Sequence, residues 1–566
     1  MINLIPAVKE LNLKDGFLEK GTVSFDKSLY SARLCRALEK LPVSENGAKL
    51  SMTVGEGEGE GYTLDVTVDS IRITSESEVG AFYAIQTLRQ LFAADRVPCL
   101  SIKDYPDFKV RGFYQDISRG KIANVTTLKK LVDQMAYYKM NILQLYVEHV
   151  FEFDGCEELH KMTSNITGEE LRELDAYCKE NFIDFQPSLA TFGHMFELLD
   201  LEKNRHLAVL KNHENDLCRW VDRHKHHTID PALDESIELV KSLIDSFAPH
   251  FTSKYFNICC DETFDLKTGY PPEIECKLYI DFVKKIIEHV KGMGKTVMMW
   301  ADILLEHPEF INEMPEDTVF LNWTYRPDPD EKKVEIFSKL NRTQVVCSGT
   351  TSWHRFCESV DREEGNIITL AEYGYKHGAV GMITTNWGDW GNLASIDNAM
   401  YGLVLGAAKS WDIKTRPTED FYSAVNTILY HCKNGMRYIR AISDVHNKIN
   451  WPLIARTAYK LHNGIGFETP PITAEVVSEV QSVYKTLAPE LSAENWEYGD
   501  FKEEMLLALE GVCVVAELGA RLIGAPVERL TDTESFISRY GAKWREKNKE
   551  SELWRIADVL RYCEEI

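Results

Sequence analysis

The sequence lacks several features that would place the chain in a large functional class. No glycine-rich dinucleotide fingerprint and no P-loop follows any of its apolar, β-prone runs, which argues against an open nucleotide-binding sheet. No apolar stretch reaches the length of a membrane span. Basic residues are scarce, because 64 lysines and arginines stand against 88 aspartates and glutamates, for a net charge of −24. This deficit argues against nucleic acid and anionic membrane as partners.

Paired cysteines are also missing. The 13 cysteines form an odd number and include no Cys-x-x-Cys pair, so no disulfide framework is visible. The stretch from Met1 to Lys9 contains no basic segment followed by an apolar run, as a signal peptide would. From these features we expect a cytoplasmic protein.

The hydropathy pattern divides the 566 residues into three regions. Residues 1–104 predict a small α+β domain, because Gly61 to Thr74 alternates like a strand and Gly80 to Phe92 has helical spacing. Residues 105–411 alternate short apolar runs with helical patterns. Residues 412–566 are mostly helical in pattern, with Phe501–Leu522 the longest amphipathic run, and the sequence gives this region no function of its own.

The middle region contains eight apolar, β-prone runs, most of them separated by helical patterns. Eight such alternations predict an α/β protein with a (β/α)₈ TIM barrel rather than an open doubly wound sheet. The runs are Val110–Tyr114, Ile142–Val147, Phe182–Leu189, Tyr255–Cys260, Thr296–Met299, Val319–Leu321, Gln344–Cys347 and Val380–Thr384.

Carboxylates and tryptophans stand at the C-terminal ends of nearly all these runs. Barrel enzymes build their active sites at that face. Each residue alone has an ordinary structural explanation, but their gathering is hard to explain as core. They are Asp116, Arg119, Glu148, His194, Asp261, Glu262, Trp300, Asp302, Trp323, Trp353, Trp387, Asp389 and Trp390.

Asp261 and Glu262 follow the buried run Tyr255–Cys260 directly. Ionised carboxylates are costly in a core, so the pair must lie where the strand ends and a cavity or solvent begins. Adjacent strand residues point to opposite faces. Both carboxylates can therefore serve one site only if the chain leaves strand geometry at Glu262. An Asp-Glu dipeptide alone is most often a solvated strand end or a helix cap, and the surrounding residues are what favour function.

Tryptophans beside carboxylates suit a carbohydrate, because an indole stacks on the apolar face of a sugar while acids bind its hydroxyls. Two carboxylates then suggest glycoside hydrolysis. Retaining enzymes hold the pair about 5–5.5 Å apart and inverting ones roughly 6.5–9.5 Å, with the bond between them. Neighbours on one strand end are poorly placed for that, so we expect one carboxyl to protonate the leaving oxygen and the other to steer a nucleophile supplied by the substrate.

Six motifs in chain order resemble glycoside hydrolase family 20, the β-N-acetylhexosaminidases. They are Arg111-Gly112-x-x-x-Asp116-x-x-Arg119, Met135-x-x-Tyr138-Lys139-x-Asn141, Phe192-Gly193-His194, Asp261-Glu262, Trp300-x-Asp302 and Trp387-Gly388-Asp389. The resemblance covers roughly residues 60–411. It implies an exo-acting enzyme that releases terminal β-linked GlcNAc or GalNAc from a small oligosaccharide or glycoconjugate by retaining, substrate-assisted catalysis, without a cofactor or metal. A homo-oligomer is compatible with it.

The resemblance also implies roles for single residues. Glu262 would be the general acid and then base, and Asp261 would bind the substrate's acetamido N–H. His194 would support both carboxylates from behind. The remaining expected roles are the acetamido pocket walls Trp300, Trp323 and Trp387, and the hydroxyl contacts Arg111 and Asp389.

Two departures from the family pattern affect the expected pocket. Glu148 and His149 follow the second strand, where most members have an aspartate, and Glu148 would take over support of the acid. The family tyrosine that binds the acetamido oxygen after the seventh strand is absent, which leaves Tyr325, Tyr373 or the Trp353 N–H as substitutes. Trp390, with Asp389 and Arg111, would decide between gluco and galacto configuration.

A catalytically silent carbohydrate-binding or sensor protein on the same barrel is the alternative function. The loop Arg223–His227 is rich in histidine, but its spacing matches no metal-ligand pattern and its two basic residues oppose a cation, so we expect a solvated loop. Asn124 and Asn165 match glycosylation acceptors that carry no meaning without a secretion signal. No nucleophile elbow surrounds Ser352, which we set aside.

Overall fold

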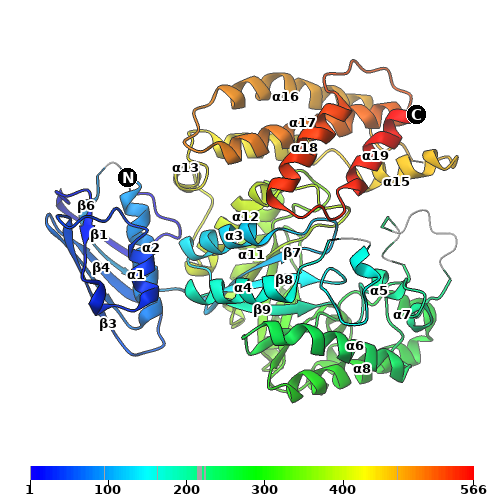
Figure 1. The fold of residues 1–566 in the computed structure, drawn as a ribbon, viewed down its shortest axis with the longest axis horizontal. Coiled ribbons are helices and arrows are strands. Elements are labelled where there is room, and N and C mark those ends of the chain that lie inside the picture. Colours follow the sequence, from blue (N-terminus) through cyan, green and yellow to red (C-terminus); the bar gives the residue numbers. More distant parts are fainter. Residues whose placement is uncertain are drawn as a thin grey trace.

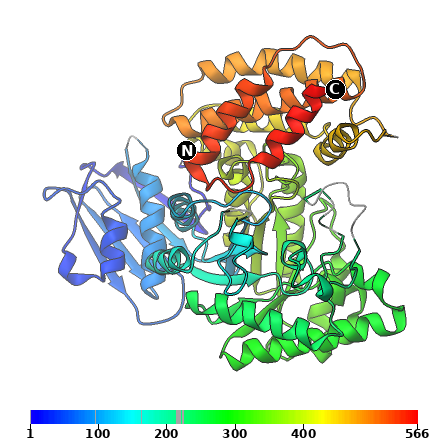
Figure 2. The same ribbon diagram turned by 45° about the vertical axis from the view of Figure 1, so that its right-hand side comes forward.

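A computed structural model gives the fold for residues 2–94, 96–161, 164–212, 220–221, 223, 225–467 and 469–566. Three parts follow one another along the chain: a small sheet domain, a closed barrel and a set of helices. The C-terminal helices lie along one side of the barrel, and the sheet domain stands at another (Figure 1, Figure 2).

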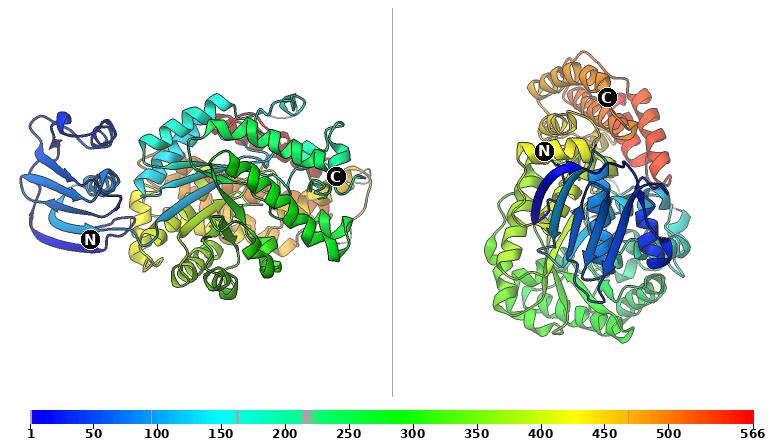
Figure 3. Two further views of the ribbon diagram at one scale, coloured as in Figure 1. Left: turned by 90° about the horizontal axis from the view of Figure 1, so that it is seen from below. Right: turned by 90° about the vertical axis from the view of Figure 1, so that its left-hand side faces the viewer.

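The N-terminal part is a six-stranded mixed sheet in the order β1-β6-β4-β5-β3-β2, which faces the viewer in the right-hand view of Figure 3. The predicted alternation is confirmed as the antiparallel pair β4 and β5, and the predicted helix as α2. Ser77 caps α2, its hydroxyl accepting from the Gly80 N–H at 3.3 Å. The elements are β1 (Glu10–Phe17), β2 (Val23–Ser24), α1 (Ala32–Leu38), β3 (Ala48–Val54), β4 (Tyr62–Val66), β5 (Ser70–Ser75), α2 (Glu78–Phe92) and β6 (Pro98–Asp104).

The middle part is a closed barrel of eight parallel strands, which confirms the predicted TIM barrel. β14 closes it against β7, with Gly381 opposite Val110. Each strand lies where an apolar run predicted one, because a strand buried on both faces reads as a continuous apolar segment. The strands are β7 (Val110–Asp116), β8 (Ile142–Val147), β9 (Asp184–Leu189), β10 (Tyr255–Asn257), β11 (Thr296–Trp300), β12 (Val319–Trp323), β13 (Gln344–Gly349) and β14 (Gly381–Asn386).

Helices surround the barrel on the outside (Figure 3, left). Amphipathic faces bury apolar residues against the strands, as α6 does with Ile237, Val240, Leu243 and Ile244. The helices are α3 (Val125–Tyr137), α4 (Gly168–Glu180), α5 (Phe196–Leu199), α6 (Asp234–Phe247), α7 (Asp265–Gly269), α8 (Pro272–Gly292), α9 (Asp302–Glu306), α10 (Glu331–Lys339), α11 (Val360–Lys376) and α12 (Met400–Trp411).

The C-terminal part is helical, as predicted, and its central helix α17 contains the predicted run Phe501–Leu522. Among the described residues, no helix combines the length and the apolar content needed to cross a membrane. The helices are α13 (Glu419–Ile428), α14 (Gly435–His446), α15 (Trp451–His462), α16 (Ala474–Ala493), α17 (Gly499–Leu522), α18 (Thr533–Lys547) and α19 (Trp554–Glu565).

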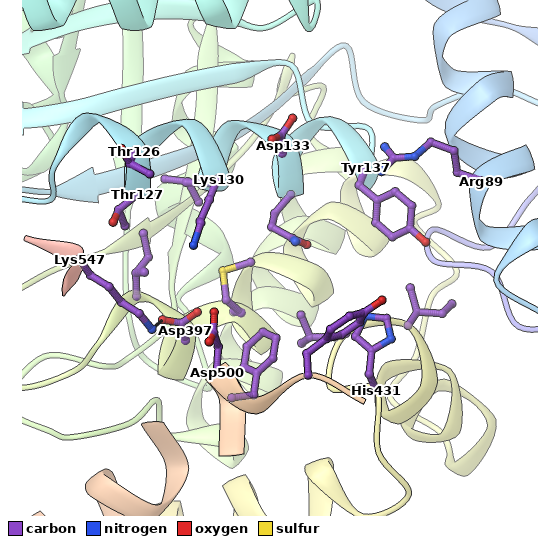
Figure 4. A pocket seen from close by; sticks show the side chains of 18 of the residues that line it. Arg89, Thr126, Thr127, Lys130, Asp133, Tyr137, Asp397, His431, Asp500 and Lys547 are labelled. Atoms are coloured by element: carbon purple, nitrogen blue, oxygen red, sulfur yellow. Dashed lines mark hydrogen bonds and ion pairs between the residues drawn. The ribbon is translucent and has the colours of Figure 1, made fainter. Parts of the chain in front are cut away.

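The three parts meet around a cavity of about 720 Å³ that runs along the outer face of α3 (Figure 4). Its charged side chains are of both signs. Arg89 of α2 stacks over Tyr137 at 4.8 Å, and Lys547 of α18 pairs with Asp397 at 2.5 Å. The Lys130 side chain points into the space between them (Figure 4).

Candidate active site

Asp261 and Glu262 follow a strand that is shorter than predicted. β10 ends at Asn257, three residues before the expected end at Cys260. The chain then takes left-handed backbone conformations, with φ of 57° at Cys259, 66° at Cys260 and 46° at Glu262. The departure from strand geometry expected at Glu262 therefore begins earlier, and it turns neighbouring carboxylates toward one side.

Neighbouring elements hold this unusual path in place. The Asn257 side-chain oxygen accepts from the Cys259 N–H at 3.0 Å, and the Tyr279 hydroxyl of α8 donates to the Cys260 carbonyl at 2.8 Å. The N–H of Glu262 donates to Asp302 Oδ2 at 2.9 Å. Because strained conformations of this kind persist only where the surroundings fix them, the path is characteristic of a functional segment.

His194 joins the two carboxylates. Its Nε2 lies 3.5 Å from Asp261 Oδ2 and 3.2 Å from Glu262 Oε2, so both acids contact the same imidazole. Of their side chains, 11% of Asp261 and 28% of Glu262 is exposed, which leaves Glu262 the nearer to solvent. Gly193 permits this contact, because a Cβ there would lie 2.4 Å from the Asp261 carbonyl oxygen.

The charge state of His194 follows from this bridge. Burial alone would lower the pKa of His194, but the charge of Asp261 and hydrogen bonds to Asp261 and Glu262 outweigh it and raise that pKa to about 10. The imidazole is thus protonated at neutral pH, with Asp261 as its main counter-charge. Burial and the nearby Asp261 charge also raise the pKa of Asp302.

The three expected wall indoles belong to one connected aromatic group. Trp300 is buried and its ring centroid lies 5.9 Å from that of Trp387. Tyr325 connects Trp387 to Trp323, because its hydroxyl accepts from the Trp387 Nε1–H at 2.5 Å while its ring stacks on Trp323 at 5.1 Å. Trp353 packs against the same tyrosine at 5.0 Å.

These contacts distinguish the three candidates left open for the missing family tyrosine. Tyr325 follows β12 and lies in the middle of the aromatic wall. Tyr373 lies in α11, a helix on the outside of the barrel. Trp353 contacts the ring of Tyr325, whereas the Tyr325 hydroxyl contacts Trp387 directly. The geometry thus favours Tyr325.

A second polar cluster surrounds Arg119, a residue to which the sequence analysis gave no role. Its guanidinium pairs with Asp116 Oδ2 at 2.9 Å, with Glu148 Oε1 at 2.8 Å and with Asp389 Oδ1 at 3.4 Å. It also lies over the Trp387 ring at 5.2 Å. Arg119 therefore connects the ends of β7, β8 and β14 beside the indoles, where sugar hydroxyls would bind.

Glu148 is fixed by two arginines. Burial alone would raise its pKa, but the charges of Arg223 and Arg119 lower the pKa of Glu148 well below its usual range. An ionised Glu148 holds Arg119 in place. The hydroxyl of Tyr146 donates to the same carboxylate at 3.0 Å.

The expectation of a solvated loop at Arg223–His227 holds for the exposed Lys225 but is wrong for Arg223 and His227. Arg223 is buried and donates to Glu148, and His227 is buried with its Nδ1 accepting from the His194 N–H at 2.8 Å. The loop instead supports the site from behind. His224 lies outside the described residues.

Two groups in the described part of the chain bring three potential metal ligands within 4.8 Å of one another: His194 with Asp261 and Glu262, and His149 with Glu197 and Glu552. In the second group Arg555 already pairs with both carboxylates, at 3.3 Å for Glu197. In the first the bridging imidazole is protonated, so neither group suits a cation.

The role expected for Arg111 is wrong. Arg111 lies at the start of β7, five residues before Asp116, which places it about 16 Å below the active face at roughly 3.3 Å per residue. It is fully buried and pairs with Glu60 of the sheet domain at 2.7 Å, while its Nη2 donates to the Tyr83 hydroxyl at 2.9 Å. Arg111 connects the sheet domain to the bottom of the barrel.

Arg111→Met is accordingly expected to destabilise the protein without changing substrate affinity. Removing one partner of a buried ion pair costs about 3 kcal/mol, because Glu60 loses its counter-charge. Urea unfolding should show this loss while KM is unchanged. Lys109→Met, on an exposed neighbour, serves as the control. A raised KM at unchanged stability would instead show that Arg111 binds the substrate.

Trp390 and Asp389 lie at the rim of the site. The Asp389 side chain is 25% exposed and pairs with Arg119. The Trp390 carbonyl accepts from the Trp451 Nε1–H of α15 at 2.9 Å. The Arg456 guanidinium lies over the Trp390 ring at 5.3 Å. The C-terminal region thus contributes to the rim, which no sequence signal indicated.

An eight-stranded barrel with adjoining carboxylates, indoles and an arginine–carboxylate cluster at its C-terminal face defines a glycoside hydrolase type of site. The family model described as the glycosyl hydrolase family 20 catalytic domain matches residues 108–365, and domain 2 of that family matches residues 1–105. The two matches together cover more than half of the chain. The chain belongs to glycoside hydrolase family 20.

Relatives and solved structures agree with this assignment. The chain is 25% identical to a beta-hexosaminidase of Vibrio furnissii over 312 residues, 48% of this chain and 49% of that protein. It is 32% identical over 160 residues to a beta-hexosaminidase of Akkermansia muciniphila, 24% of this chain and 32% of that protein. The structure of a Flavobacterium johnsoniae chitobiase shares the fold, with a TM-score of 0.62 over 100% of this chain and 99% of that chain at 18% identity. The chain spans about half or less of the length of the curated relatives it matches.

Proposed function

We propose that the protein is an exo-acting β-N-acetylhexosaminidase that hydrolyses terminal β-linked GlcNAc or GalNAc. The observation that carries this proposal is the bridge from His194 to both Asp261 and Glu262 at the face of the barrel where the expected indoles also lie. One protonated imidazole holds the two acids side by side. They are thus placed to act on one side of a sugar rather than across its glycosidic bond.

The first step divides the work between the two acids. Glu262, the more exposed, protonates the glycosidic oxygen as the bond to the anomeric carbon breaks. Asp261, the more buried, accepts a hydrogen bond from the acetamido N–H, and the acetamido oxygen attacks the anomeric carbon. The Asp261 carboxylate stabilises the positive charge of the resulting oxazolinium ion.

The second step returns the protons. Glu262, now ionised, takes a proton from a water molecule whose oxygen attacks the anomeric carbon. The bond from that carbon to the acetamido oxygen breaks, which restores the acetamido group. The sugar leaves with its original configuration, because two displacements occur at one carbon. Arg119 and Asp389 would bind the sugar hydroxyls, and the Tyr325 hydroxyl would donate to the acetamido oxygen in place of the missing family tyrosine.

A carbohydrate-binding or sensor protein without catalysis remains the second candidate, since the family tyrosine is absent. The cleft retains both acids with a solvent-facing Glu262, which a binder does not need. This favours the enzyme.

Nitrophenyl N-acetyl-β-glucosaminide and -galactosaminide separate the two functions. An enzyme should release nitrophenol from at least one of them and should act far more slowly on the glucoside that lacks the acetamido group. Binding of GlcNAc by calorimetry without turnover of either substrate would support the binder instead.

We propose a reducing compartment, the cytoplasm, as the site of action. The support is that the twelve cysteines in the described part of the chain are all free thiols, most of them buried.

A further inference from the structure

A smaller cavity, of about 260 Å³, adjoins the rim of the proposed active site. It lies between the loop that follows β13 and the turn that connects α14 to α15. Its lining, all within the described residues, includes the cations Arg355, Arg362 and Lys448 but no aspartate or glutamate. Such a concentration of one sign is unusual in a chain with a net charge of −24.

Arg355 is the buried member of this group. Only 8% of the residue is exposed, and its guanidinium donates to two neutral acceptors, the Asn447 side-chain oxygen at 2.5 Å and the Ser443 carbonyl at 3.4 Å. No ion pair to Arg355 is found within the described residues. Burial, assisted by the nearby Arg362 charge, lowers the pKa of Arg355 to about 10.

A buried cation without a counter-charge is costly, so an anion entering the cavity would gain from it. Arg362 is exposed at the cavity wall and forms no ion pair with the described residues either. The cavity along α3 differs in this respect, because its cations face the carboxylates Asp133, Asp397 and Asp500 (Figure 4). Of these two cavities, only the smaller has no carboxylate in its described lining.

Two aromatic residues that line the smaller cavity also contact residues of the candidate active site. Trp353 lines it and packs at 5.0 Å against Tyr325 of the acetamido wall. His354 also lines it and lies 6.3 Å from the ring of Trp390 at the rim. Trp451, on the opposite wall, donates its Nε1–H to the Trp390 carbonyl. The cavity thus borders the rim residues of the candidate active site.

We infer that this cavity is a subsite for an acidic leaving group, a sugar carrying a carboxylate or a sulfate. The inference rests on the proposed function, because only a hydrolase has a leaving group to accommodate. It assigns to the C-terminal region, which supplies the turn at 447–452, a part in choosing the substrate. Arg355 and Arg362 are the residues that would bind the carboxylate or sulfate of the leaving sugar.

Matched disaccharides test the subsite. GlcNAc β-linked to glucose, to glucuronic acid and to glucose 6-sulfate differ only at carbon 6 of the leaving sugar. The wild type should cleave at least one acidic form with a higher kcat/KM than the neutral one, and added salt should reduce the preference. The two acidic forms distinguish a carboxylate from a sulfate subsite.

Arg362→Glu should then lower kcat/KM for the preferred acidic disaccharide by at least about fivefold, the size expected for one partly screened ion pair. Its kcat/KM for the neutral disaccharide should be unchanged. Arg437→Glu, which alters an exposed arginine of the same region outside the cavity, makes the same charge change and should retain the preference. Arg362 and Arg437 are both exposed, so neither substitution replaces a buried side chain.

The outcomes separate this inference from the proposed function. Equal cleavage of acidic and neutral disaccharides by the wild type, or equal loss in the two variants, would overturn the subsite and leave the hydrolase intact. Cleavage of the nitrophenyl substrates but of none of the disaccharides would also overturn it. No cleavage of any substrate would overturn both.

Discussion

Glu262→Gln is expected to lower kcat on substrates with poor leaving groups by roughly 10²–10⁴-fold, the usual contribution of a general acid. Glutamine keeps the size and the hydrogen-bonding capacity of the side chain but has no proton to give to the glycosidic oxygen. Binding of GlcNAc should change little, because Asp261 and the indoles are untouched. Steady-state kinetics on a methyl or sugar aglycone, with GlcNAc binding by calorimetry, measures both effects.

The leaving group supplies the control for Glu262→Gln. A dinitrophenolate leaves without a proton, so the first step of the variant should be nearly as fast on that substrate as in the wild type. The second step still needs a base, and the variant should therefore show a burst of dinitrophenol followed by slow turnover. A variant with equal losses on good and poor leaving groups would take the acid role away from Glu262.

The barrel could be predicted from the sequence because its strands are buried on both faces and read as separate apolar runs. The end of β10 could not. Cys259 and Cys260 are as apolar as the strand before them, and nothing in their identity indicates a left-handed backbone. Contacts from Tyr279 and Asp302, distant in sequence, fix that path.

The site was predictable where residue type and strand end coincide, as at Asp261, Glu262, His194 and Trp387. It was not predictable where one motif contains two similar residues. Arg111 and Arg119 belong to the same motif, and only their distance along β7 decides which one faces the pocket. The rise of about 3.3 Å per strand residue would have placed Arg111 far from the C-terminal end of β7.

The rim depended on still longer-range contacts. Trp451 and Arg223 reach the site from a distant helix and a loop whose composition suggested solvent exposure. Their partners, the Trp390 carbonyl and Glu148, become visible only when the chain is folded.

Asp261→Asn is expected to reduce kcat by roughly 10²–10³-fold, the range found when one stabilising group at a developing charge is removed. Asparagine can still accept the acetamido hydrogen bond, but it has no negative charge to stabilise the oxazolinium ion. A thiazoline that imitates this ion should therefore bind more weakly, while GlcNAc binding should be less affected. Kinetics and inhibition by the thiazoline measure the two effects.

The same substitution should change His194, since the Asp261 charge is the main cause that raises its pKa to about 10. A histidine NMR titration should show a lower His194 pKa in Asp261→Asn. Because a folded-state pKa above the unfolded value stabilises the fold at low pH, the stability that His194 contributes is complete below about pH 6.5 and is lost as the pH rises toward 10. The variant should lose most of that contribution at neutral pH. A substrate without the acetamido group separates the action of Asp261 on the substrate's amide from this structural effect. If Asp261→Asn slowed hydrolysis of that substrate by the same factor as hydrolysis of the acetamido substrate, Asp261 would act through the fold and not on the amide.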